Sequence, residues 1–174
     1  MTVSIGGATI SGGVILGDIN NVVPYPLDIF AWASGAGTNN CTLSRDPTTG
    51  LSPAGGIPMK MTVTGTDPYI ATYSSAQWNL APAAVGQTWR AQVYAKASIS
   101  TSVSIFIFGS LSNGAYIEAP SGGGSITTSW SLVTFTTTFT DPSTVFTQTR
   151  LDGPDSGTIG TEIWFDQYML YRVS

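Results

Sequence analysis

The stretch TWRAQVYAKA, residues 88–97, alternates strictly between two kinds of side chain. One set is apolar and comprises Trp89, Ala91, Val93, Ala95 and Ala97, whereas the other set is polar apart from one tyrosine. Because successive side chains of a β-strand point to opposite faces, this period of two predicts a strand with one face on a core and the other toward solvent. An amphipathic helix would instead repeat its apolar residues about every 3.6 positions.

Similar short runs rich in Thr, Val, Ile, Phe and Tyr follow one another along the chain, separated by Gly, Pro, Asn and Asp. None of them carries a helical stripe. Besides 88–97, we predict strands at residues 27–33, 41–45, 57–64, 69–73, 102–108, 116–118, 130–140, 146–151 and 161–172. Many short strands at this spacing predict an all-β fold, specifically a two-sheet jelly-roll sandwich.

Two further strands indicate how they face. In WSLVTFTTTFT, residues 130–140, Val133, Phe135 and Phe139 are expected to face the core, opposite a row of threonines. The run SIFIFG, residues 104–109, is apolar on both faces. This pattern suits a central strand or a strand that is covered by another chain.

A glycine-rich apolar segment, VSIGGATISGGVILGD, occupies residues 3–18. It lacks the basic start of a signal peptide and the roughly 20 apolar residues of a membrane-spanning helix, so we predict neither. We assign residues 1–26 to an extended N-terminal arm and residues 27–174 to the jelly roll. The arm residues expected to pair with another strand are Val3, Ile5, Ile10, Val14, Ile15 and Leu16. A strand of this kind is poorly stable alone, so it joins either its own sandwich or a neighbouring subunit; we favour the second.

The charge pattern argues against two classes of partner. Charged residues make up 9% of the chain, the net charge is −4, and the six basic residues are scattered. Nucleic acid and anionic membranes attract clustered basic residues, so neither is an expected partner.

The chain also lacks the residues of common catalytic sites. It has no histidine, and its single cysteine, Cys41, can form neither an internal disulfide nor a multi-thiolate metal site. The tripeptide Asp155-Ser156-Gly157 matches the aspartic protease signature, but it lies in LDGPDSGTIG, a run of turn formers. The two glutamates, Glu118 and Glu162, form no evident pair with the aspartates, most of which adjoin Pro or Gly. We therefore predict that the protein is not an enzyme.

Three segments resemble carbohydrate-binding modules of the family 4/9/22 type: VGQTWRAQVYAKAS, WSLVTFTTTFT, and IWFDQYML around Asp166. The resemblance covers about residues 28–174 and implies a jelly roll that stacks aromatic rings on sugars and hydrogen-bonds their hydroxyl groups. It implies a sugar site at Arg90, Gln92 and Tyr94, beside Lys96, with Trp78, Tyr73 or Tyr116 as a second platform. The alternative is that these are ordinary residues of a solvated strand. The resemblance also implies Asp166 as a ligand of a structural calcium ion, and no other cofactor is expected.

The first twenty residues contain Ile5-Gly-Gly followed by Ile10-Ser-Gly-Gly, a pattern that resembles the start of tailed-phage structural proteins. With a jelly roll that stands alone, it implies a non-enzymatic virion protein assembled in the host cytoplasm. Our main hypothesis is a capsid decoration (cement) protein that stabilises the shell through its jelly roll and arm. Its partners would be the major capsid protein and other copies of the chain, a trimer being favoured. The alternative is a lectin-like carbohydrate-binding module or tail appendage that mediates attachment to glycans or a host surface.

Overall fold

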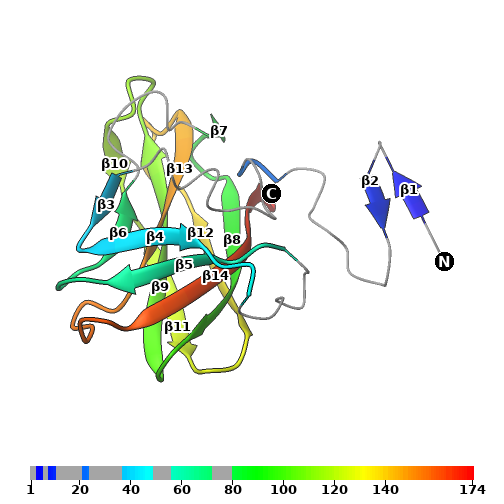
Figure 1. Ribbon diagram of the computed structural model, residues 1–174. Helices are drawn as coiled ribbons and strands as arrows, with labels where there is room; N and C mark the ends of the chain where they lie inside the picture. The colour runs from blue at the N-terminus through cyan, green and yellow to red at the C-terminus, as the bar shows by residue number, and fades with distance from the viewer. Residues whose placement is uncertain (1–2, 6–7, 11–20, 24–36, 49–55, 72–79) are drawn as a thin grey trace.

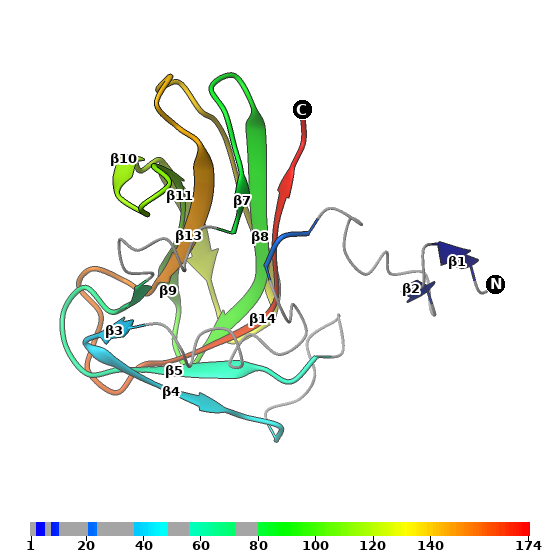
Figure 2. The same cartoon turned by 90° about the horizontal axis from the view of Figure 1, so that it is seen from above.

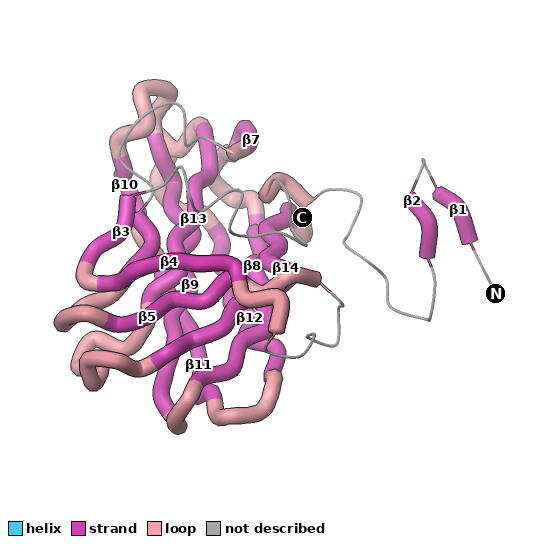
Figure 3. The backbone as a smooth tube through the Cα atoms, viewed as in Figure 1, coloured by secondary structure: helices cyan, strands magenta, loops and turns pink. Residues whose placement is uncertain are grey.

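A computed structural model describes residues 3–5, 8–10, 21–23, 37–48, 56–71 and 80–174 of the chain. These residues are all-β, and residues from 37 onward form two antiparallel sheets packed as a sandwich, which confirms the predicted fold class (Figure 3). Within them we find no helix with the length and apolar character that a membrane crossing requires.

The first sheet has seven strands, in the order β10-β9-β13-β6-β3, with β11 also paired to β9 and β7 to β13 (Figure 1). Its strands are β3 (Gly37–Asn39), β6 (Tyr69–Ala71), β7 (Ala81–Pro82), β9 (Thr101–Ser110), β10 (Tyr116–Glu118), β11 (Ser121–Ile126) and β13 (Phe146–Asp152). The doubly apolar run in β9 is therefore a central strand, which is one of the two situations that its pattern predicts.

The second sheet has five strands, in the order β12-β8-β14-β5-β4. They are β4 (Cys41–Arg45), β5 (Met59–Val63), β8 (Thr88–Ala97), β12 (Ser131–Thr138) and β14 (Glu162–Arg172). In β8 every second residue from Trp89 to Ala97 is buried, and the residues between them are half-buried, as the alternation predicts. The pairing of β14 with β8 shifts between Asp166 and Met169, and β14 changes direction along its length (Figure 2).

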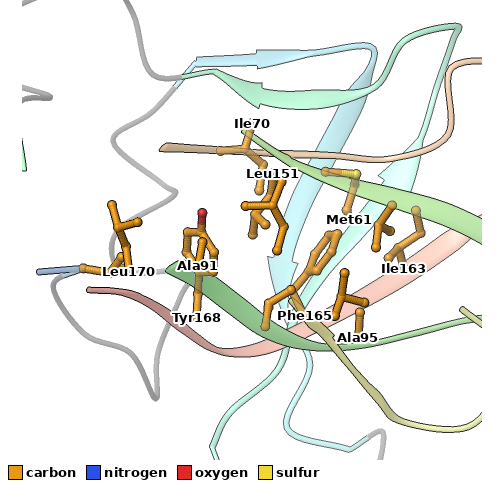
Figure 4. Close-up of a cluster of buried hydrophobic side chains, with 14 of the residues drawn as sticks. Met61, Ile70, Ala91, Ala95, Leu151, Ile163, Phe165, Tyr168 and Leu170 are labelled. Atoms are coloured by element: carbon orange, nitrogen blue, oxygen red, sulfur yellow. The ribbon is translucent and has the colours of Figure 1, made fainter. Parts of the chain in front are cut away.

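The core lies between the two sheets (Figure 4). Met61, Ile163 and Phe165 of the five-stranded sheet are fully buried, as are Ile70 and Leu151 of the seven-stranded sheet. The side chain of Tyr168 lies in this layer, and its hydroxyl forms a hydrogen bond with the hydroxyl of Thr149 across the sandwich. Burial raises the pKa of Tyr168 above its usual range, so the hydroxyl stays protonated in this bond.

Strand β11 has the sequence SGGGSI, which does not predict a strand, because glycine contributes nothing to a hydrophobic pattern. Gly122 pairs with Ile105, and a Cβ atom at Gly122 would lie 2.4 Å from the ring of Phe135. The ring thus takes the space that a side chain on β11 would fill. A Cβ at Gly123 would lie 1.9 Å from the backbone oxygen of Val103, so glycine lets the two strands approach closely.

The described part of the predicted arm falls into two pieces. Strands β1 (Val3–Ile5) and β2 (Ala8–Ile10) pair with each other in a separate two-stranded sheet, with Val3 opposite Ile10. Residues 21–23 instead lie along β14, where the backbone N–H of Val22 donates to the oxygen of Leu170 and Val23 is buried in the core. Val14, Ile15, Leu16 and the predicted strand at 27–33 lie outside the described residues. Pairing of the arm with a neighbouring subunit stays a prediction.

Candidate functional site

The outer face of the seven-stranded sheet carries aromatic and polar side chains from four strands. Because Ile105 and Ile107 of β9 are buried in the core, Phe106 and Phe108 lie on the opposite face. The register places residues of β13 beside them, with Arg150 opposite Phe106. We call this surface the aromatic face, and it consists of Tyr69, Phe106, Phe108, Tyr116, Gln148, Arg150 and Asp152.

Three of its rings form a row of near-parallel stacks. The centroids of Phe106 and Phe108 are 5.6 Å apart with an interplanar angle of 12°. Those of Phe108 and Tyr116 are 4.3 Å apart, with an angle of 16°. Phe108 is buried, whereas Phe106 and Tyr116 are half-buried, so the two end rings keep part of their surface exposed.

Arg150 connects this row to the next strand. Its guanidinium carbon lies 4.3 Å from the ring centroids of both Phe106 and Tyr69. A terminal nitrogen donates to Oδ2 of Asp152 at 2.6 Å. Nε of Arg150 and Oδ1 of Asp152 are also buried, and neither has a hydrogen-bond partner among the described residues. Buried polar atoms are costly to leave unpaired, so an additional polar partner for either atom would stabilise the fold.

The carboxyl group of Asp152 has an unusual protonation equilibrium. Burial raises its pKa from 3.8 to about 6, although the hydrogen bond from Arg150 acts in the opposite direction. The nearby negative charges of Asp67 and Asp155 raise the pKa further. The charge of Asp152 therefore changes within a range that ordinary buffers cover.

Two polar residues hold the loops around this face. The amide nitrogen of Gln148 donates to the backbone oxygen of Gly114, in the turn that precedes Tyr116. The carboxylate of Glu118 accepts hydrogen bonds from the hydroxyl of Thr144 at 2.6 Å and from the backbone nitrogen of Thr140 at 3.1 Å. Glu118 thereby ties β10 to the loop between β12 and β13.

The sugar site predicted from the sequence lies on the other sheet. Nε of Arg90 donates to the hydroxyl of Thr136 at 3.0 Å, and Gln92 accepts a hydrogen bond from the hydroxyl of Tyr171. Tyr94 lies opposite Leu132 of β12. Trp78 and Tyr73 lie outside the described residues, and Tyr116 belongs to the seven-stranded sheet, so it is no second platform for Tyr94. This site stays a prediction.

Lys96 completes that strand face. Its ammonium nitrogen is 5.2 Å from the ring centroids of both Trp130 and Trp164. Trp164 is only 8% exposed, and its indole nitrogen donates to Asp46 at 2.9 Å. Trp164 therefore exposes too little of its ring for a sugar to stack on it.

Asp166, the predicted calcium ligand, is fully buried. Its two oxygens accept hydrogen bonds from the backbone nitrogens of Gly56 at 3.1 Å and Gln167 at 2.8 Å. Within the part of the chain that the structure describes, no group of three or more acidic, cysteine or histidine residues is arranged to hold a metal ion. Calcium binding at Asp166 stays a prediction.

The remaining reactive candidates have structural settings. Asp155 and Ser156 lie in the loop between β13 and β14, where the backbone nitrogen of Gly157 donates to the oxygen of Pro154 in a turn. Burial raises the pKa of Cys41 to about 11, which disfavours the reactive thiolate. Glu162 pairs with Lys60 at 2.8 Å.

No family model matches the chain, and no curated protein matches it either. Solved structures do. A family 61 carbohydrate-binding module in complex with β-1,4-galactotriose superposes with a TM-score of 0.55 at 9% identity, covering 87% of this chain and 98% of that one. A family 4 carbohydrate-binding module gives a TM-score of 0.52 at 18% identity, covering 80% and 95%.

The enzymatically active domain of tailspike protein 4 from bacteriophage CBA120 gives a TM-score of 0.63 at 9% identity and covers 88% of this chain. The chain spans only 21% of that tailspike chain and 24% of an α-L-arabinofuranosidase chain that it also matches. At these identities the likeness concerns the fold. It confirms the carbohydrate-binding-module-like jelly roll that the sequence motifs indicate.

Proposed function

We propose that the protein is a non-catalytic glycan-binding module and that the aromatic face is its binding surface. The observation that carries this proposal is the row of three stacked rings beside the paired side chains of Arg150 and Asp152. Aromatic faces pack against the C–H faces of sugars, and a few convergent polar groups fix the hydroxyls.

The acidic residues of this surface support binding without catalysis. The aromatic face contains one carboxylate, Asp152, whereas glycoside hydrolysis uses two at a set separation. The nearby Glu118 is already engaged by Thr140 and Thr144. Binding without cleavage is therefore the activity that this surface supports best.

Glycan binding is better supported than capsid decoration. The similar structures include carbohydrate-binding modules, one of them in complex with a galactotriose. The likeness to a phage tailspike domain supports a second candidate, in which the module belongs to a tail appendage that attaches a virion to glycans. Capsid decoration through the arm, with a trimer on the major capsid protein, stays a prediction. This prediction is tested by deleting residues 1–20 and measuring whether the truncated protein still binds phage particles and what the mass of its native assembly is.

A glycan array tests the proposed function, followed by titration of the best sugar with two matched variants. Tyr116→Ala removes the open end of the ring row, and Tyr94→Ala removes a half-buried tyrosine from the other sheet. We expect Tyr116→Ala to weaken binding about fivefold to tenfold, which corresponds to about 1 kcal/mol of stacking. Tyr94→Ala should change the affinity less than twofold. The absence of any saturable sugar binding, or its loss only in Tyr94→Ala, would overturn the proposal.

A further inference from the structure

Positive charge is divided unequally between the two sheets. The chain has six basic residues, and all of them lie in described strands. Five belong to the five-stranded sheet: Arg45, Lys60, Arg90, Lys96 and Arg172. Arg150 is thus the one basic residue of the seven-stranded sheet, and it supplies the positive charge of the aromatic face.

That cation already has an anionic partner. Oδ2 of Asp152 lies 2.6 Å from a terminal nitrogen of Arg150, and the side chain of Asp152 is 4% exposed. The rings of Tyr69 and Phe106 flank the guanidinium at 4.3 Å each, which restricts its orientation. Arginine binds carboxylates through its planar edge. One terminal nitrogen that could bind a ligand carboxylate is therefore already paired with a carboxylate of the chain itself.

We propose that Asp152 determines the charge specificity of the aromatic face. Asp152 is the internal counter-ion of Arg150, so the face accepts uncharged sugars and rejects uronic acids. This inference rests on the proposed function. A uronate placed beside Arg150 would bring a second carboxylate next to Asp152, and Arg150 would be the one cation available to neutralise the two negative charges. Like charges that share one site repel each other, and such repulsion discriminates between otherwise similar ligands.

The test compares two charge-neutralising variants. Asp152→Asn and Glu162→Gln each remove one negative charge and one ion pair, but they release Arg150 on the aromatic face and Lys60 on the other sheet, respectively. The probes are neutral oligosaccharides, β-1,4-galactotriose and xylohexaose among them, and oligogalacturonates of similar length. We expect the wild type to bind uronates at least tenfold more weakly than neutral sugars. Asp152→Asn should reduce that ratio at least fivefold, and Glu162→Gln should leave it unchanged.

The wild-type protein provides a second readout that needs no substitution. Protonation of Asp152 removes the same negative charge, so uronate binding relative to neutral-sugar binding should rise from pH 8 to pH 5 and follow the pKa of about 6. The other titratable groups around Asp152 are Arg150, Tyr69, Asp67, Asp155, Cys41 and Tyr168. Cys41 and Tyr168 stay uncharged in this range because burial raises their pKa values.

The outcomes separate the two proposals. If no sugar of either class binds, the proposed function fails. If neutral sugars bind but uronates bind equally well, or if the ratio responds neither to Asp152→Asn nor to pH, the role of Asp152 is wrong while the proposed function stands.

Discussion

The two outer faces of the sandwich are built from similar residue types but use them differently. On the five-stranded sheet, Arg90 and Gln92 bond to neighbours on the same face, and Asp166 is buried beneath that face. On the seven-stranded sheet, Arg150 and Asp152 bond to each other and each keeps a further polar atom without a partner among the described residues. The polar groups of the first face are bonded within the fold, whereas the second face retains buried polar atoms whose hydrogen bonding is incomplete among the described residues.

This contrast makes a general point about strand faces. An alternating row of polar and aromatic residues is equally typical of a solvated sheet and of a binding surface. What distinguishes them is whether the donors and acceptors are satisfied within the fold. Substitutions should therefore reduce stability on one face and ligand affinity on the other.

The largest effect is expected at Asp166 on the five-stranded sheet. Asp166→Ala removes a buried carboxylate that accepts two backbone hydrogen bonds, so it should lower the free energy of unfolding by about 3 kcal/mol. Urea denaturation measures this change. Asp166→Asn, which keeps an acceptor oxygen, should lose less. A loss below about 1 kcal/mol for the alanine variant would contradict the structural role of this face.

A smaller effect is expected from the protonation of Asp152. Its pKa is about 6 in the folded protein and near 3.8 in the unfolded chain, so the folded state binds the proton more tightly. This group therefore stabilises the fold as the pH falls from above 6 toward 4, by on the order of 2 kcal/mol. The measurement is the difference between the stability–pH curves of the wild type and Asp152→Asn. A flat difference between pH 4 and 7 would rule out the raised pKa.

A ring substitution tests the aromatic face more finely than truncation. Phe106→Leu keeps an apolar side chain but removes the ring that stacks on Phe108 and lies over Arg150. We expect sugar affinity to fall about threefold to fivefold, because aromatic stacking and cation–π contacts contribute about 1 kcal/mol at partly exposed sites. Trp130→Leu, at the residue before β12 of the opposite sheet, is the control, and calorimetric titration should show its affinity unchanged.

The smallest effect is expected at the Lys60–Glu162 ion pair. The two side chains are 26% and 36% exposed, so solvent screens their attraction. Glu162→Gln should lower the free energy of unfolding by less than about 1 kcal/mol, and added salt should remove the difference. A larger, salt-independent loss in thermal or urea unfolding would show that this pair contributes more than its exposure indicates.

Much of the fold could be predicted from the sequence, because alternating polar and apolar residues indicate a strand with one face toward solvent and one face in the core. Strands β4, β8 and β10 have the bounds that their patterns predict. Strand β11 could not be predicted in this way, since three glycines carry no pattern and its pairing with β9 depends on close backbone approach.

The candidate site was harder to predict than the fold. Its residues come from strands β6, β9, β10 and β13, and only strand pairing brings Tyr69 and Phe106 to Arg150. One signal was present, since a strand that is apolar on both faces places Phe106 and Phe108 outside the core. The clearer alternation of β8 points to that strand instead, but its residues Arg90 and Gln92 are already bonded to their neighbours.

Because the ring of Phe135 lies against Gly122, the side-chain volumes at these two positions constrain each other. The ring of Phe135 reaches across the sandwich into space that β11 leaves empty, so neither position is free to change alone. A larger residue at 122 requires a smaller one at 135, and a smaller one at 135 opens a cavity beneath the edge of the seven-stranded sheet. Natural variants of this protein should therefore exchange volume between these two positions and keep the sum nearly constant.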